Sequence, residues 1–381
     1  MARGIVIGKN QEVVIERLVL IPTVVSIFSS TKQIDLTITK PVIKKAALAL
    51  VSALTTKKTQ TSEAAAVNIR HINIDAMQLV WPDTKYPLMN AQATLSADNK
   101  LELATVESVD GKLKADVRPN GDEQLIMLTA TAYTLPASVP LLIDIAKLEM
   151  HLKASKLDIS NIDIALYGGK LTGKAVVSWD NNWKASGRLT IANLALKQPT
   201  NLISKSVYLS GNLFSNGSFS SIANDASRLA DNLNANFTFK VNNGVLHGLD
   251  LVKVASILLK QSQNGGETQF DAFSGLLNSS GKQYHLRDLK ISSGLLSATG
   301  QVKIKANKTL DGTGVVDVKN SMGLTGIPLY VSGTVSKPVV LPSKAALAGA
   351  LAGTAILGPG VGTSVGIKAG GAMDKLKGLF K

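Results

Sequence analysis

The chain contains 381 residues, of which 45% are hydrophobic and only 4% aromatic, and it carries a net charge of +14. The absence of cysteine excludes disulfides, thiol nucleophiles and thiolate metal sites. The basic excess favours an anionic partner. Because the Lys and Arg residues are scattered and not interleaved with aromatic side chains, the pattern argues against nucleic acid and favours a membrane surface.

Residues 1–66 are predicted to hold N-terminal strands, one helix and a linker. The first residues lead directly into strand-like sequence without an apolar signal core, so an export segment or membrane anchor is expected upstream. A helix is predicted over residues 42–54, because Pro41 suits a helix start and one face of the segment is apolar. The Thr- and Lys-rich residues 55–66 are predicted to form the linker.

Residues 67–220 are predicted to form a central β region, because short runs of alternating apolar and polar residues are bounded by turn residues. In one such run Leu189 and Ile191 lead into Leu194 and Leu196, so the period slips by one residue between the two pairs. A slip of this kind flips the outward face unless a bulge absorbs it. We therefore predict a bulge or turn between the pairs.

Residues 221–341 are predicted to continue the β structure. Two helices are expected within this region, over residues 221–233 and 250–261, because each segment repeats apolar residues on one helical face. Alternating strands make up the remainder of the region.

Together these segments predict a mainly β protein. We expect a long, curled antiparallel sheet that forms an open groove, with a few short helices and a C-terminal apolar segment rich in Gly and Ala. Short strands with few aromatic residues argue against the alternative of a closed pore. One aliphatic face of such a sheet would shelter acyl chains. The predicted groove positions are the alternating aliphatic residues Leu329, Val331, Val335, Val302, Ile304, Ile162 and Ile164.

The sequence from residue 229 onward carries a distinctive order of motifs. Residues 229–251 combine a helix end, a strand, a glycine turn and a second strand that closes on Gly-x-Asp-Leu. The motifs that follow are residues 268–275, 284–293, 298–302 and 326–338. This order resembles the C-terminal region of the AsmA family. Looser similarity is found in residues 33–43 and 72–83.

The resemblance implies a groove-forming sheet related to the TamB- and chorein-type lipid bridges. It implies a place in the bacterial cell envelope, on the periplasmic side and associated with the inner membrane. It also implies a role in phospholipid transport and outer-membrane homeostasis, with phospholipids, the membrane surface and other envelope proteins as partners. AsmA-like proteins generally begin with a transmembrane helix, which this sequence lacks. The alternative on the same fold is a non-catalytic scaffold or regulator of outer-membrane protein assembly.

Residues 342–381 are predicted to form a membrane-interacting tail. Residues 345–367 carry no charge and have the length of a bilayer span, but Gly-Pro-Gly at 358–360 breaks the run. A membrane-touching hairpin or surface segment is therefore favoured, with a packed glycine-rich plug and a single span as alternatives. A small cationic amphipathic face follows. The predicted membrane contacts are Leu347, Leu351, Ile356, Leu357, Val361, Val365, Met373, Leu376, Phe380, Lys375, Lys377 and Lys381.

Residues that carry catalysis are sparse in this sequence. The four histidines, at positions 71, 151, 247 and 285, lie far apart, and none has a partner at metal-ligand spacing. We therefore predict no enzyme activity, no metal site and no cofactor.

Overall fold

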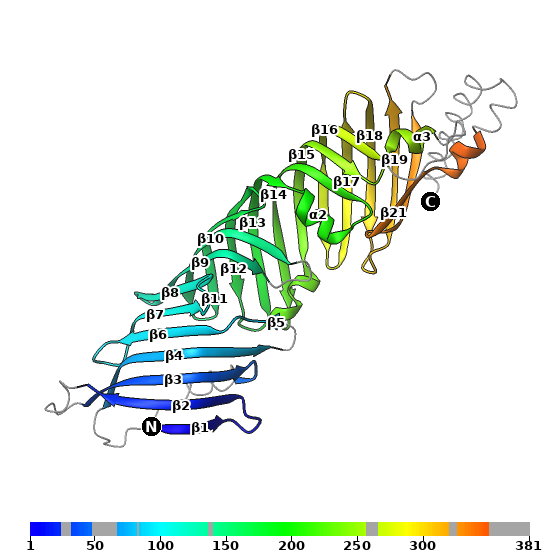
Figure 1. Cartoon of the computed structure of the whole chain (residues 1–381). Coiled ribbons are helices and arrows are strands. Elements are labelled where there is room, and N and C mark those ends of the chain that lie inside the picture. Colours follow the sequence, from blue (N-terminus) through cyan, green and yellow to red (C-terminus); the bar gives the residue numbers. More distant parts are fainter. Residues whose placement is uncertain are drawn as a thin grey trace. The chain divides into compact units, whose positions relative to one another are not determined.

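The computed structural model describes residues 1–23, 32–47, 67–81, 84–135, 140–256, 266–319 and 326–349 (Figure 1). Strands dominate this part of the chain and its helices are few and short, which confirms the predicted mainly β class. The contacts divide the chain into two compact units, Met1–Ile164 and Ala165–Lys381.

The first unit is a sheet whose strands pair mostly with their neighbours in sequence. Its strands are β1 (Ala2–Ile7), β2 (Val13–Pro22), β3 (Lys32–Lys44), β4 (Val67–Trp81), β5 (Thr84–Lys85), β6 (Met89–Leu95), β7 (Leu101–Ser108), β8 (Leu113–Asn120), β9 (Glu123–Leu135), β10 (Leu141–Lys153) and most of β11 (Lys156–Leu166). The short β5 pairs with the end of β4, and β6 pairs with the rest of β4.

The pairing of β3 with β4 is parallel, whereas β1 with β2, β2 with β3, β4 with β5 and β6, and the successive pairs from β6 to β10 are antiparallel. The described strands of this unit are therefore antiparallel, as predicted, with the exception of this one pairing. A parallel pair needs a crossover of a dozen or more residues, and residues 45–66 between the two strands supply that length. The helix predicted over residues 42–54 is wrong at its start, because β3 continues to Lys44. Residues 48–54 and the linker at 55–66 lie outside the described residues.

The second unit continues with strands that each pair antiparallel with the next, from β12 to β21. They are β12 (Gly169–Ser178), β13 (Trp183–Ala195), β14 (Tyr208–Ala223), β15 (Asn234–His247), β16 (Glu267–Ser280), β17 (Gln283–Ser292), β18 (Leu296–Ile304), β19 (Leu310–Val318), β20 (Ile327–Thr334) and β21 (Lys337–Pro342). The bulge predicted after Ile191 is confirmed: the register with β14 shifts between Ile191 and Leu194, and Asn193 has a φ of 56°.

The helices of this unit are α2 (Lys197–Ile203), the 3-10 turns η2 (Ala226–Arg228) and η3 (Ala230–Asn232), and α3 (Leu251–Ser256). A further helical turn covers residues 344–349. The helix predicted over residues 221–233 is wrong, because β14 extends to Ala223 and two 3-10 turns follow. The helix predicted over residues 250–261 is confirmed for α3, and residues 257–261 lie outside the described residues.

The sheet is open, as predicted. Among the described strands, β1 pairs only with β2, and β21 pairs only with β20. The predicted antiparallel order holds throughout the second unit.

Within the second unit the sheet curls strongly. The hydroxyls of Ser204 and Ser206, between α2 and β14, donate to the Ser336 carbonyl in the β20–β21 turn, at 3.1 and 2.6 Å. In the pairing order β14 and β20 are six strand positions apart, which in a flat sheet would separate them by about 29 Å. The two contacts therefore require the sheet to coil back on itself.

One face of the curled sheet carries the main hydrophobic core of this unit. α3 contributes Leu251, Val254 and Ala255, which pack on side chains from β18, β19 and β20. Ala346 of the last helical turn is fully buried in the same cluster. This core covers only the part of the apolar face that lies under α3 and the last helical turn.

Candidate functional site

An uninterrupted line of apolar residues crosses the second unit from β12 to β21. Residues that pair directly across antiparallel strands point to the same face of the sheet. Following the pairings strand by strand gives the central apolar row, which consists of Gly173, Leu189, Gly217, Phe237, Leu277, Leu286, Val302, Gly312, Val331 and Val340. The row runs across the strands, and no polar side chain interrupts it.

The side chains of the central apolar row are only half-buried. None of them belongs to the buried core. Two rows away on the α3 side the exposure is different, since Val241, Val316 and Ile327 of that row are 1%, 1% and 0% exposed. The α3 core includes Val316 and Ile327, and of the central apolar row it contacts Val340 alone, so the rest of the central row is the part of the apolar face left open to a ligand.

The first unit shows the same construction. One row consists of Ala2, Leu18, Ile38, Ile74, Ala91, Val106, Ala115, Leu128 and Leu148. The row beside it consists of Leu20, Leu36, Ile72, Ala93, Ala104, Val117, Ile126 and Met150. Of all these residues only Met150 is buried. Each unit therefore carries its own open apolar face.

Four of the predicted groove residues lie together on the apolar face of the second unit. Val302 and Val331 belong to the central apolar row, where each pairs with Gly312. Leu329 lies in the adjacent row and is buried at 5% exposure in the α3 core. Ile304 lies on the other side of the row, paired with Tyr284 and Leu310.

The other three predicted groove residues lie elsewhere. Val335 is in the β20–β21 turn, where its backbone N–H donates to the Lys308 carbonyl. Ile162 and Ile164 belong to the first unit, where Ile162 is buried and Ile164 packs on the cluster of Ala130, Ile143 and Ala146. Tyr133 packs on the same cluster, and its burial raises the pKa of its phenol.

Of the predicted membrane contacts, only Leu347 lies within the described residues, where it is 36% exposed. The others lie outside them, namely Leu351, Ile356, Leu357, Val361, Val365, Met373, Leu376, Phe380, Lys375, Lys377 and Lys381.

The opposite face of the second unit is polar, because strand alternation turns the residues between the apolar ones outward. A representative line across it is Lys174, Arg188, Ser218, Asn236, Asn278, His285, Lys303 and Asp311. Arg287 Nε donates to Asn278 Oδ1 at 2.8 Å, and Asn278 Nδ2 donates in turn to Asn236 Oδ1. The sheet is therefore amphipathic, with side-chain hydrogen bonds on its polar face.

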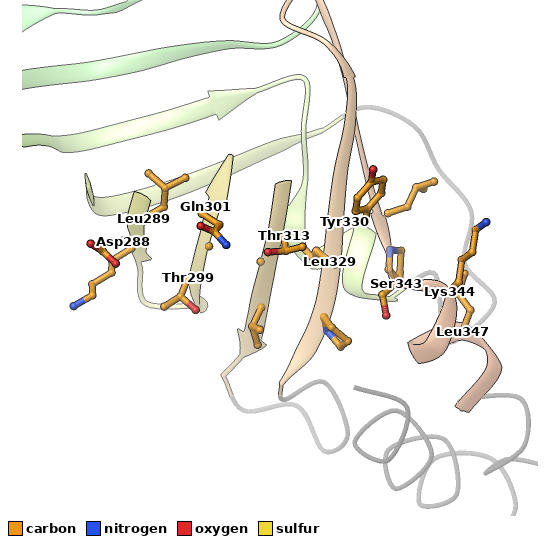
Figure 2. Close-up of a pocket in the computed structure, with 17 residues that line it drawn as sticks. Asp288, Leu289, Thr299, Gln301, Thr313, Leu329, Tyr330, Ser343, Lys344 and Leu347 are labelled. Atoms are coloured by element: carbon orange, nitrogen blue, oxygen red, sulfur yellow. The ribbon is translucent and has the colours of Figure 1, made fainter. Parts of the chain in front are cut away.

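A cavity of about 1230 Å³ lies on this polar face, over strands β17 to β21. Figure 2 shows Asp288 at one end and Leu347 at the other. Thr299 and Gln301 line it from β18, and because they alternate with Val302 they point away from the central apolar row. No residue of the central apolar row lines the cavity, although Leu289 and Leu329 of the row beside it do.

A hydrogen-bonded chain of three side chains also lies on the polar face, at the ends of β14, β15 and β16. Ser210 Oγ lies 2.9 Å from His247 Nε2, and His247 Nδ1 lies 2.6 Å from Glu267 Oε1. Tyr208 stacks on the imidazole, with 4.4 Å between ring centroids. These hydrogen bonds were not predicted from the sequence, because only the pairing of β14, β15 and β16 brings Ser210, His247 and Glu267 together. A hydroxyl, an imidazole and a carboxylate in this order have the arrangement of a nucleophile, a base and an orienting acid.

Two further findings bear on function. Within the described ranges, no group of three or more His, Asp and Glu side chains is arranged to hold a metal ion. Among the helices that the structure describes, none has the length and apolar character needed to cross a bilayer.

Comparison with known families matches residues 23–281 to the model described as the AsmA family. The match covers more than half of the chain and contains strands β3 to β16. It includes the motif at residues 229–251 and ends before the motif that begins at residue 284. No curated protein and no solved structure matches the chain.

Proposed function

The chain belongs to the AsmA family, which is generally associated with the cell envelope, and from this premise we propose that it shelters phospholipid acyl chains on the apolar faces of its sheet. In this proposal the protein acts on the periplasmic side of the envelope, near the inner membrane, and contributes to phospholipid transport and outer-membrane homeostasis. Its partners are phospholipids, a membrane surface and other envelope proteins.

The observation that carries the proposal is the central apolar row, which is both continuous and open. A core residue is buried by a second layer of protein, whereas Phe237, Leu286 and Val302 are only half-buried. Each methylene that leaves water gains about 0.8 kcal/mol, so an acyl chain lying along the row is held against dissociation into water. A bilayer offers the same gain. The free energy of an acyl chain on the central apolar row is therefore close to its free energy in a bilayer. Such a balance suits a protein that transfers lipid better than one that retains it.

We also propose that the protein is not an enzyme. The arrangement that most resembles a catalytic site consists of the hydrogen-bonded Ser210, His247 and Glu267. None of the three lines the cavity over β17 to β21. Glu267 has a side chain that is 53% exposed, which leaves the orienting hydrogen bond open to water. A fluorophosphonate probe should accordingly leave Ser210 unlabelled, and its covalent capture would contradict the proposal.

The lipid-sheltering role is tested with a matched pair on β13. Leu189 belongs to the central apolar row, and the next residue, Thr190, is exposed on the polar face. Leu189→Asp places a carboxylate where an acyl chain would lie, whereas Thr190→Asp places the same charge on the wet face. Val302→Asp repeats the disruption five strands away.

Each variant is purified gently, checked for folding by circular dichroism, and analysed for bound phospholipid by native mass spectrometry. We expect Leu189→Asp and Val302→Asp to lose at least about tenfold of the phospholipid bound by the unchanged protein, because a buried charge costs several kcal/mol. Thr190→Asp should retain it. Equal lipid in all folded variants would contradict the proposal. An unchanged protein without any lipid would favour the scaffold alternative.

A further inference from the structure

The cavity over β17 to β21 lies on the polar face, so a ligand bound along the central apolar row would not fill it. We propose that it binds a single-chain amphiphile with an anionic head group, such as a fatty acid or a lysophospholipid. The site is distinct from that of the proposed function, because no residue of the central apolar row lines the cavity.

One end of the cavity is polar. Its lining side chains on β17 and β18 are Lys290, Thr299 and Gln301. Among the described residues the Lys290 ammonium has no ion-pair or hydrogen-bond partner. It is therefore available to an anion, beside the hydroxyl of Thr299 and the amide of Gln301. Asp288 also lines this end and is the one carboxylate among the lining residues.

The other end of the cavity is apolar, although it lies on the wet face. Val315 and Pro328 line it from β19 and β20. Tyr330, Leu341 and Leu347 complete it and are 46%, 49% and 36% exposed. Large hydrophobic side chains gathered in a hollow at such exposure indicate a binding site.

The polar-to-apolar order follows the pairing of the strands. Lys290, Thr299, Val315 and Pro328 pair in sequence across β17, β18, β19 and β20. Four strand spacings from β17 to β21 measure about 19 Å, which accommodates a head group and a medium-length chain laid across the strands. A compact ligand without a tail would leave the apolar end empty.

The charges on the rim favour an anion over a cation. Lys290 and Lys344 line the cavity against the single carboxylate of Asp288. Lys344 and Leu347 belong to the helical turn that the buried Ala346 fixes to the core. The wall at the apolar end is therefore anchored before any ligand arrives.

The test measures binding to the full chain by isothermal titration calorimetry below the critical micelle concentration. The probes are laurate, a lysophosphatidylglycerol with the same chain, and the uncharged dodecyl maltoside. Lys290→Glu should weaken binding of both anionic probes about tenfold and leave dodecyl maltoside unchanged. Lys303→Glu is the matched control, because Lys303 is exposed on the same face of β18 but does not line the cavity.

Two more variants separate this site from the apolar face. Leu341→Asp should weaken all three probes, since it removes part of the apolar end. Val302→Asp, on the central apolar row, should leave unchanged the part of the anionic binding that depends on Lys290. Binding of either anionic probe with this pattern supports the proposal, and the tighter one identifies the source of the anion. Equal losses in Lys290→Glu and Lys303→Glu, no binding by the unchanged protein, or loss of the Lys290-dependent binding in Val302→Asp would overturn it.

Discussion

Individual glycines set the local shape of the apolar face. A Cβ built on Gly217 would lie 2.1 Å from the Asn236 carbonyl oxygen and 2.6 Å from the Phe237 ring. Phe237 pairs with Gly217 in the central apolar row, so the ring occupies the space that the glycine leaves. Glycine at this position therefore allows a large apolar side chain to lie flat on the sheet.

Replacing Gly217 by Ala should lower the free energy of unfolding by about 1–3 kcal/mol, because the added methyl group overpacks against backbone and ring. Gly294→Ala is the control, since nothing lies within 4 Å of its Cβ position. The control should be neutral or stabilise the protein by up to about 1 kcal/mol. Urea unfolding of the two variants measures the difference, and equal midpoints would show that Phe237 moves aside freely.

At the residue scale, the sequence predicted which side chains share a face within a strand but not which ones meet across strands. The alternation of Val302 with Lys303 identifies two faces without any structure. That Val302 and Val331 flank Gly312 depends on the register of β18, β19 and β20. Register is a non-local property, so neither the central apolar row nor the His247 hydrogen bonds could be read from the sequence.

Two serine hydroxyls connect elements that are far apart in the chain. Ser204 and Ser206, before β14, both donate to the Ser336 carbonyl in the β20–β21 turn. Replacing Ser204 and Ser206 together by Ala should lower the free energy of unfolding by about 1–2 kcal/mol, since both hydrogen bonds are lost. Hydrogen exchange should quicken at Val335 and Lys337, whose amides belong to the tied turn.

The control for this prediction is Ser215→Ala. The Ser215 hydroxyl donates to the Thr238 carbonyl at 2.8 Å. This hydrogen bond joins the neighbouring strands β14 and β15 and not the β20–β21 turn. Exchange in the β20–β21 turn should be unchanged in this variant. If the double variant also leaves the turn unchanged, the backbone alone maintains the curl.

Helices were harder to predict than strands because helical spacing occurs within sequences that pair as strands. Ile222 and Ala226 have the spacing of a helical face, yet β14 continues through Ile222 to Ala223. The Ser221 hydroxyl then bonds to the Leu229 carbonyl, and the Asp225 side chain accepts from the Ser227 N–H at the start of η2. Pairing with β13 from Asn212 to Ala223 outweighs one potential helical turn. The short α2 was missed altogether.

At the scale of the whole chain, the net charge of +14 and the apolar C-terminal sequence predict reversible binding to anionic membranes. A deletion that tests this must begin after residue 349, because Ala346 belongs to the core and Leu347 lines the cavity. Removing residues 350–381 should leave the sheet folded and abolish co-sedimentation with anionic vesicles.

A charge variant separates the two contributions to membrane binding. Replacing Lys375, Lys377 and Lys381 by Gln should weaken binding less than the deletion does, and mainly at low salt, because salt screens exposed charges. If the deleted protein sediments as well as the intact one, membrane contact arises elsewhere on the basic surface.

The neighbour-to-neighbour pairing of the strands has a consequence for how the chain folds. Each strand from β12 to β21 pairs with the next along the chain, and most of the connections are short, the longest being residues 248–266 between β15 and β16. Contact order is therefore low for a β protein, and little entropy is lost in closing most of the hairpins. Hairpins are therefore expected to form one after another as the chain lengthens. The parallel join of β3 to β4 must enclose residues 45–66, which makes it the slowest step of the first unit. A hairpin gained or lost in the second unit would alter no other pairing, so the length of its apolar face is free to change during evolution.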